Sequence, residues 1–89
     1  MSKRFNIIET NSSGRYSIGV DTSQNIHFLA IPVANRLVDY EEYYSLSQDE
    51  YENFLADDAA ASSFAEQCRR REMDARLILQ PGSDRGAPI

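Results

Sequence analysis

With 89 residues, the chain is long enough for one hydrophobic core but too short for two, so we expect a single domain. Apolar residues make up 42% of the chain and charged residues of both signs 26%, a composition that excludes wholesale disorder. The net charge of −5 disfavours direct binding to nucleic acid, because phosphate attraction provides most of that affinity, and it favours a basic partner.

Cysteine use and the length of the apolar runs favour a cytoplasmic protein. Cys68 is the one cysteine, so no disulfide can form within the chain. The first residues become polar too early to provide the apolar core of a signal peptide. The longest apolar run, residues 28–34, has the length of a strand, whereas a membrane-spanning helix needs roughly 18 apolar residues. We therefore expect a cytoplasmic location and no membrane insertion.

The first two strands are predicted over residues 5–10 and 15–21. A cluster of turn-forming residues over 11–14 separates them and should join them as a hairpin. In the second segment, apolar side chains alternate with others in the period-two pattern of a half-buried strand: Tyr16, Ile18 and Val20. Gly19 falls on the opposite face, where it predicts a bulge.

A third and a fourth strand are predicted before the helices. Residues 26–33 are apolar on both faces, as expected of a central strand, with Pro32 near its end. Residues 37–44 fit either a fourth strand or the approach to a helix, and we favour the strand.

Two short helices are predicted in the second half of the chain. Ser47 and Glu50 have the spacing of a capping box, in which each side chain bonds the backbone of the other residue. This helix should end near Ala56 and bury one face: Tyr51, Phe54 and Leu55. A second helix, capped by Asp57 or Asp58, should bury a stripe at helical spacing: Ala61, Phe64, Ala65 and Cys68.

The end of the second helix and the residues after it carry the remaining predictions. We expect Arg69–Arg71 in the last turn of the second helix, where positive charge complements the helix dipole. Residues 77–79 form a short closing strand or pack against the sheet, and residues 81–89 have the composition of a flexible tail. The predicted fold is an α+β domain over residues 1–80, with an antiparallel sheet of three to four strands followed by two short helices packed on one face.

The residues that most often carry chemistry are scattered along the sequence. His27 lies in the most apolar strand without neighbouring ligands, which favours a structural or surface histidine. Cys68 falls on the apolar stripe of the second helix and is expected to be a small buried hydrophobe; a reactive thiol is the less favoured alternative. Adjacent acids such as Glu41 and Glu42 point to opposite faces of a strand, so they form no acid–base pair. We expect no enzymatic activity, metal or cofactor.

The charges are distributed unevenly along the chain. Residues 37–68 contain nine acids and no lysine or arginine, whereas five arginines follow. Helix capping explains several of the acids but not residues 39–44, in which tyrosines and acids are interleaved. Tyrosine rings suit a desolvated contact, and acids attract a basic partner. The predicted partner-binding residues are therefore Asp39, Tyr40, Glu41, Glu42, Tyr43 and Tyr44. The alternative, that the tyrosines simply cover a sheet edge, has equal weight.

Three segments carry a resemblance to a known family. Asp39–Ser47, Phe64–Glu72 and Pro81–Gly86 look like those of small bacterial immunity proteins of contact-dependent and other polymorphic toxin systems. The resemblance covers roughly the C-terminal half of the chain. It implies a cytosolic protein that binds a toxin domain, often a nuclease, and blocks its active site or substrate groove. The family has no universal motif, so the resemblance implies no individual binding residue.

Three functions follow from these observations, in decreasing order of preference. The first is an immunity protein that neutralises a cognate, nuclease-type toxin by occluding it one to one, with the acidic surface occupying a cationic groove. The second is a self-assembling or regulatory adaptor domain that uses the tyrosine-rich edge strand to pair with another chain. The third is an enzyme acting through Cys68. The sequence leaves the toxin and the oligomeric state open.

Overall fold

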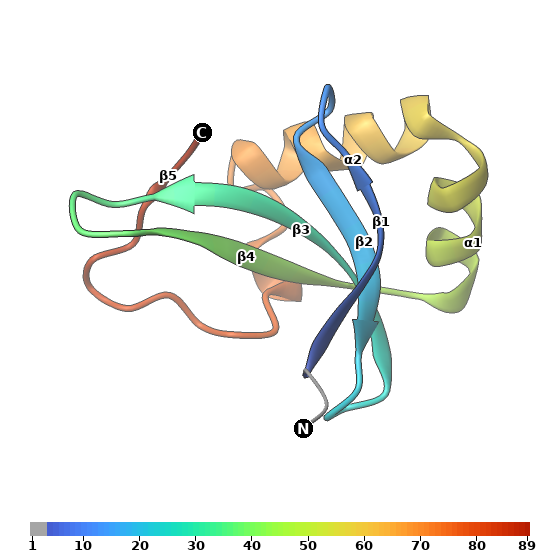
Figure 1. Cartoon of the computed structure of the whole chain (residues 1–89), viewed down its shortest axis with the longest axis horizontal. Coiled ribbons are helices and arrows are strands. Elements are labelled where there is room, and N and C mark those ends of the chain that lie inside the picture. The colour runs from blue at the N-terminus through green and yellow to red at the C-terminus, as the bar shows by residue number, and fades with distance from the viewer. Residues whose placement is uncertain (1–3) are drawn as a thin grey trace.

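The computed structural model describes residues 4–89 and confirms the predicted α+β fold. Its elements are, in chain order, β1 (Phe5–Asn11), β2 (Tyr16–Asp21), β3 (Ile26–Ala34), β4 (Asp39–Leu46), α1 (Gln48–Ala56), α2 (Asp58–Arg69), a single 3-10 turn η1 (Asp74–Arg76) and β5 (Ala87–Pro88). The antiparallel sheet has the order β1-β2-β3-β4, and β5 pairs with β3 (Figure 1). Residues 37–44 were correctly assigned to a strand, although the strand begins two residues later and continues to Leu46.

The turns between the strands begin at short polar residues whose side chains bond the backbone of the turn. Asn11 Oδ1 accepts from the Gly14 N–H at 2.8 Å. Asn35 Oδ1 accepts from the backbone N–H groups of Leu37 and Val38 at 2.8 and 2.9 Å. Asp21 is fully buried, accepts from two N–H groups of its own turn, and forms a two-bonded ion pair with Arg4. Local side-chain chemistry therefore sets these chain reversals.

The two faces of the sheet have different environments. One face, here called the helix face, carries the side chains of Ile18, Leu29 and Tyr44, which form the core together with α1 and α2. The other, here called the open face, carries those of Phe28 and Tyr43. Figure 1 shows α2 behind the sheet and no helix in front of it. The prediction that both helices pack on one face is confirmed.

A β-bulge interrupts the pairing of β1 with β2. Ile7 pairs with Gly19 and Glu9 with Ile18, so Ile8 is the extra residue. The bulge therefore lies in β1, opposite Gly19, and not at Gly19 itself as predicted. It bends the edge strand, which disrupts the regular row of hydrogen-bonding groups along that edge.

Both helices begin as the sequence predicts. In the capping box of α1, Ser47 Oγ accepts from the Glu50 N–H at 3.1 Å, while Glu50 Oε1 accepts from the Ser47 N–H at 2.8 Å. Asp57 caps α2, and the predicted stripe is buried: Ala61, Phe64, Ala65 and Cys68. The prediction for Arg69–Arg71 was wrong in part, because only Arg69 lies in the last turn; Arg70 is the C-cap and Arg71 has a φ of 62°.

Ser47→Ala should lower the free energy of unfolding by about 1 kcal/mol, because the Glu50 N–H loses its partner at the start of α1. Chemical denaturation followed by circular dichroism measures this change. Ser47→Asp is the matched control, since aspartate caps as well as serine and should keep the midpoint close to that of the wild type. An unchanged midpoint in Ser47→Ala would show that the capping box does not stabilise this fold.

The end of the chain forms a strap across the sheet, here called the C-terminal strap (residues 79–89). Before it, Leu77 bridges to Tyr44, and the Ile78 N–H donates to the Tyr43 carbonyl at 2.9 Å. The strap then passes from the outer edge of β4 over the helix face. Its last residues form β5, which pairs with β3 beyond the end of β2 (Figure 1). The predicted flexibility of residues 81–89 stays a prediction, and these contacts disfavour it.

Candidate functional site

The alternation of β4 divides the predicted partner-binding residues between the two faces of the sheet. Tyr40, Glu42 and Tyr44 lie on the helix face, whereas Asp39, Glu41 and Tyr43 lie on the open face. Tyr44 is 0% exposed and Glu42 only 7% exposed, so neither is available to a partner. Tyr40 is half-buried, and its hydroxyl accepts from the Gly86 N–H at 2.6 Å. The six residues therefore do not form one surface, and those exposed on the open face remain as candidates.

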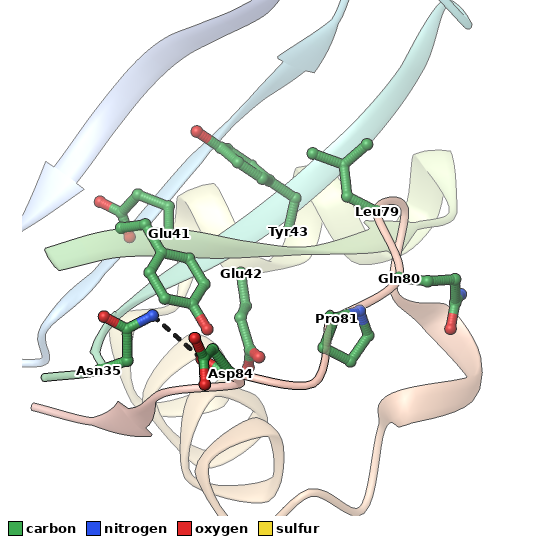
Figure 2. Close-up of a pocket in the computed structure, with 10 residues that line it drawn as sticks. Asn35, Glu41, Glu42, Tyr43, Leu79, Gln80, Pro81 and Asp84 are labelled. Atoms are coloured by element: carbon green, nitrogen blue, oxygen red, sulfur yellow. Dashed lines mark hydrogen bonds between the residues drawn. The ribbon is translucent and has the colours of Figure 1, made fainter. Parts of the chain in front are cut away.

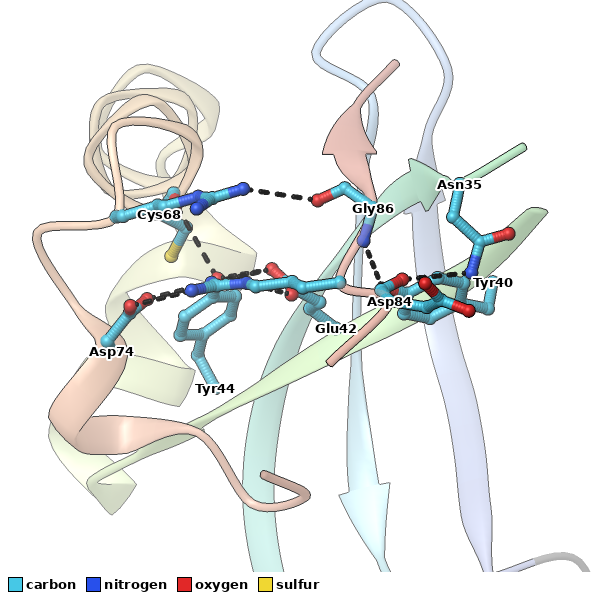
Figure 3. Close-up of polar contacts among 10 residues, drawn as sticks. Asn35, Tyr40, Glu42, Tyr44, Cys68, Asp74, Asp84 and Gly86 are labelled. Carbon is cyan, nitrogen blue, oxygen red and sulfur yellow. Dashed lines mark hydrogen bonds and ion pairs between the residues drawn. The ribbon is translucent and has the colours of Figure 1, made fainter. Parts of the chain in front are cut away.

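Glu42 instead belongs to a buried ion network that holds the strap. Arg85 donates to both oxygens of Glu42, at 2.7 and 3.2 Å, and to both oxygens of Asp74, at 2.8 and 2.9 Å (Figure 3). The Tyr44 hydroxyl donates to Glu42 Oε1 at 2.8 Å. Burial, reinforced by this bond to Glu42, raises the pKa of Tyr44, and the bond from Arg85 lowers the pKa of Asp74. This network has a structural role.

The open face carries an aromatic cluster that holds Tyr43 in place. The Tyr43 ring stacks on Phe5 with centroids 3.8 Å apart, and both rings meet Phe28 edge-on, at 5.0 and 5.6 Å. Phe28 is fully buried beneath them, whereas Phe5 and Tyr43 are half-buried. Desolvation, together with the nearby Glu41 carboxylate, raises the pKa of Tyr43. Tyr43 is thus a rigid aromatic group next to an acid.

A cavity of about 340 Å³ lies at the outer edge of β4. Figure 2 shows Tyr43 and Leu79 on one side of the strand and Pro81 on the other, with the Asn35–Asp84 hydrogen bond at one end. Its acidic lining residues are Glu41, Glu42 and Asp84. Partial desolvation raises the pKa of Glu41. Glu41 also lines a second cavity of about 230 Å³ on its other side, next to Pro32 and Ser17.

The uneven charges of the sequence are partly neutralised in the folded chain. The C-terminal arginines pair with acids from the preceding segment: Arg69 with Glu66, Arg76 with Glu50, and Arg85 with Glu42. Glu41 and Asp39 on the open face, and Asp84 on the strap, have no ion pair or side-chain hydrogen bond to another residue in the described part of the chain. Among the described residues, acids without an ion pair therefore lie around the β4 edge and also on the two helices, where Asp49, Glu52, Asp57 and Asp58 have none.

The other candidates from the sequence have structural surroundings. His27 is half-buried and stacks on Tyr51, with ring centroids 3.9 Å apart. Cys68 is buried, and desolvation raises the pKa of its thiol to about 12, so it is a neutral thiol at pH 7. Within residues 4–89, no group of three or more His, Cys, Asp or Glu residues could hold a metal ion. No helix in the same range is long and apolar enough to cross a membrane.

Two parts of this site could not be found from the sequence. The strap supplies Asp84 and Pro81 to the cavity wall, although residues 81–89 read as a linker. Arg85 pairs with Glu42, so Glu42 is not available to a partner as predicted. Nothing in the local sequence indicates that long-range pair. Comparison of the chain with protein-family models, with curated proteins and with solved structures found no match.

Proposed function

We propose that this protein is a stoichiometric inhibitor of the immunity type, which binds a basic toxin domain through the open face near the β4 edge. The observation that carries this proposal is the pairing of Tyr43, a rigid half-exposed ring, with Glu41, a carboxylate without a cation. A fixed aromatic ring loses little conformational entropy on binding, and an unpaired carboxylate attracts a positively charged groove. The toxin-immunity assignment itself depends on the sequence resemblance.

The charge argument favours a nuclease-type toxin as the partner. A groove that binds phosphates is cationic, and carboxylates on a rigid surface can occupy it in place of the nucleic acid. The protein's net charge of −5 supports the long-range part of this attraction. Unpaired acids near the β4 edge add a local attraction at the proposed interface: Asp39, Glu41 and Asp84.

A second candidate function is self-association, but through the β1 edge and not through the tyrosine-rich strand β4, whose outer edge already contacts Leu77 and Ile78. Ile7 and Ile8 on β1 are exposed, at 43% and 51%, which gives the β1 edge an apolar surface. The bulge at Ile8 opposes continuous strand pairing, so we rank this function second. Light scattering coupled to size-exclusion chromatography distinguishes the inhibitor function from self-association. A dimer that Ile8→Lys converts to monomer supports the adaptor function.

Glu41→Lys tests the proposed function. With the partner first captured from the native cell and identified, the association rate should fall, and it should depend less steeply on salt than in the wild type. Glu52→Lys on α1 is the matched control, because it makes the same charge change at an exposed position away from the β4 edge. Tyr43→Ala should mainly speed dissociation. Wild-type association rates in Glu41→Lys would exclude this surface as the interface.

A further inference from the structure

The cavity at the β4 edge exposes backbone as well as side chains. The Tyr43 carbonyl accepts from the Ile78 N–H, which shows that Tyr43 directs its backbone groups to the outer edge. Strand geometry makes Glu41, two residues away, point its N–H and carbonyl to the same edge. The strap has already left β4 at this point, and the space between them is the cavity. The cavity therefore presents a carbonyl acceptor beside the Glu41 carboxylate.

The charge of the cavity favours a cation. Three of the lining residues are acidic and none is lysine or arginine. Glu42 is already paired with Arg85, whereas the carboxylates of Glu41 and Asp84 have no partner in the described chain. Partial desolvation already makes the charged form of Glu41 less favourable, and an incoming cation would relieve that cost. An anion would be repelled by the carboxylates that line the cavity.

The walls of the cavity fit a long side chain with a flat head. Leu79, on the same side of β4 as Glu41, provides apolar surface for a methylene stem, and the Tyr43 ring on that side provides aromatic surface (Figure 2). A guanidinium group is planar, stacks on aromatic rings and donates several hydrogen bonds at once. A lysine ammonium group would use the charge but not the flat surfaces.

We propose that this cavity is a specific pocket for an arginine side chain of the partner protein, with the guanidinium donating to the Glu41 carboxylate. The inference rests on the proposed function and names the chemistry of the residue that the partner inserts. The pocket is lined by β4, by the strap and by Asn35 of the turn between β3 and β4, so its shape depends on the docked strap. A metal ion is a poorer occupant, because the described residues offer no three-ligand group.

Nuclear magnetic resonance titration tests the pocket directly, with N-acetyl-arginine N-methylamide as the probe. We expect saturable shifts of the backbone amides of Glu41, Gly82 and Asp84. N-acetyl-citrulline N-methylamide has nearly the same shape without the charge, and it should produce no comparable shifts. Glu41→Gln should weaken binding of the arginine probe by at least about fivefold, as expected for loss of one charge-assisted hydrogen bond. Glu52→Gln, the control on α1, should bind it like the wild type.

Three results would overturn the arginine pocket: equal shifts with the citrulline probe, shifts that map away from the β4 edge, or wild-type binding of the arginine probe by Glu41→Gln. The same experiment separates this inference from the proposed function. If the probe binds as expected while Glu41→Lys leaves partner association unchanged, the cavity binds arginine but the partner does not insert one there, and the proposed interface fails. If partner association falls while the probe does not bind, the interface stands and the arginine pocket fails.

Discussion

Arg85→Ala should lower the free energy of unfolding by about 3 kcal/mol, which is a large share of the stability of a domain of this size. The guanidinium is 14% exposed and neutralises Glu42, whose side chain is only 6% exposed. Without Arg85, the Glu42 carboxylate would remain buried, and the Tyr44 hydroxyl would be its one hydrogen-bond donor among residues 4–89. A buried charge without its counter-ion costs far more than the pair contributes when intact.

Thermal and urea denaturation of the Arg85→Ala variant measure this effect. Arg70→Ala is the control, because Arg70 pairs with Glu72 on the exposed surface and its loss should leave the midpoint nearly unchanged. The dependence of stability on pH provides a second measurement. Since Arg85 lowers the pKa of Asp74, the Arg85–Asp74 pair stabilises the fold above the ordinary aspartate pKa, and that stability is lost as the pH falls through the lowered pKa. Arg85→Ala should lack this contribution, so its free energy of unfolding should fall less than that of the wild type as the pH is lowered. A midpoint equal to that of Arg70→Ala would contradict the role of the ion network.

Gly19→Ala should destabilise the fold by about 2 kcal/mol, through steric overlap and not through a forbidden backbone angle. A Cβ atom at this position would lie 2.1 Å from the Asn6 carbonyl oxygen and 2.8 Å from Phe28 Cζ. The carbonyl belongs to the backbone of β1, so it can move only if the pairing at the bulge changes. The Phe28 ring is fixed between Phe5 and Tyr43, so it cannot easily turn away.

Gly82→Ala is the matched control for this substitution, because no atom of the described chain beyond its two sequence neighbours lies within 4 Å of the added Cβ. Urea denaturation should place Gly82→Ala close to the wild type and Gly19→Ala well below it. Gly19→Ala should also change the packing of the Tyr43 ring, because that ring contacts Phe28. Near-ultraviolet circular dichroism would report this change. Equal midpoints for the two variants would show that β1 adapts to the added methyl group.

The elements that the sequence predicts correctly are those encoded within a few neighbouring residues. The capping box of α1 requires only Ser47 and Glu50, and the turn at Asn11 requires a side chain and a nearby backbone N–H. Helical spacing likewise identified the buried stripe of α2. Each of these patterns depends on residues close together in the sequence, so contacts with the rest of the fold do not alter the predicted structure.

The site was harder to predict because its surfaces depend on contacts between distant segments. Alternation in a strand separates Glu41 from Glu42, but it does not say which face will be covered. That face is decided by the two helices and the strap, which bury Glu42 and Tyr44. A joint charge reversal of Glu41 and Glu42 would therefore unbalance the Arg85 network, so the binding test must change Glu41 alone.

The position of Arg85 late in the chain also has a consequence for folding during synthesis. Arg85 follows its partner Glu42 by 43 residues, so at about 5 to 20 residues per second the ribosome adds it roughly 2 to 9 s later. A hairpin such as β3–β4 can form within microseconds, long before its counter-ion exists. Until then, closing the sheet would bury Glu42 without neutralisation. A sheet that closes before then leaves Glu42 buried without its counter-ion, so the closed core should reach its full stability only after the strap has been added.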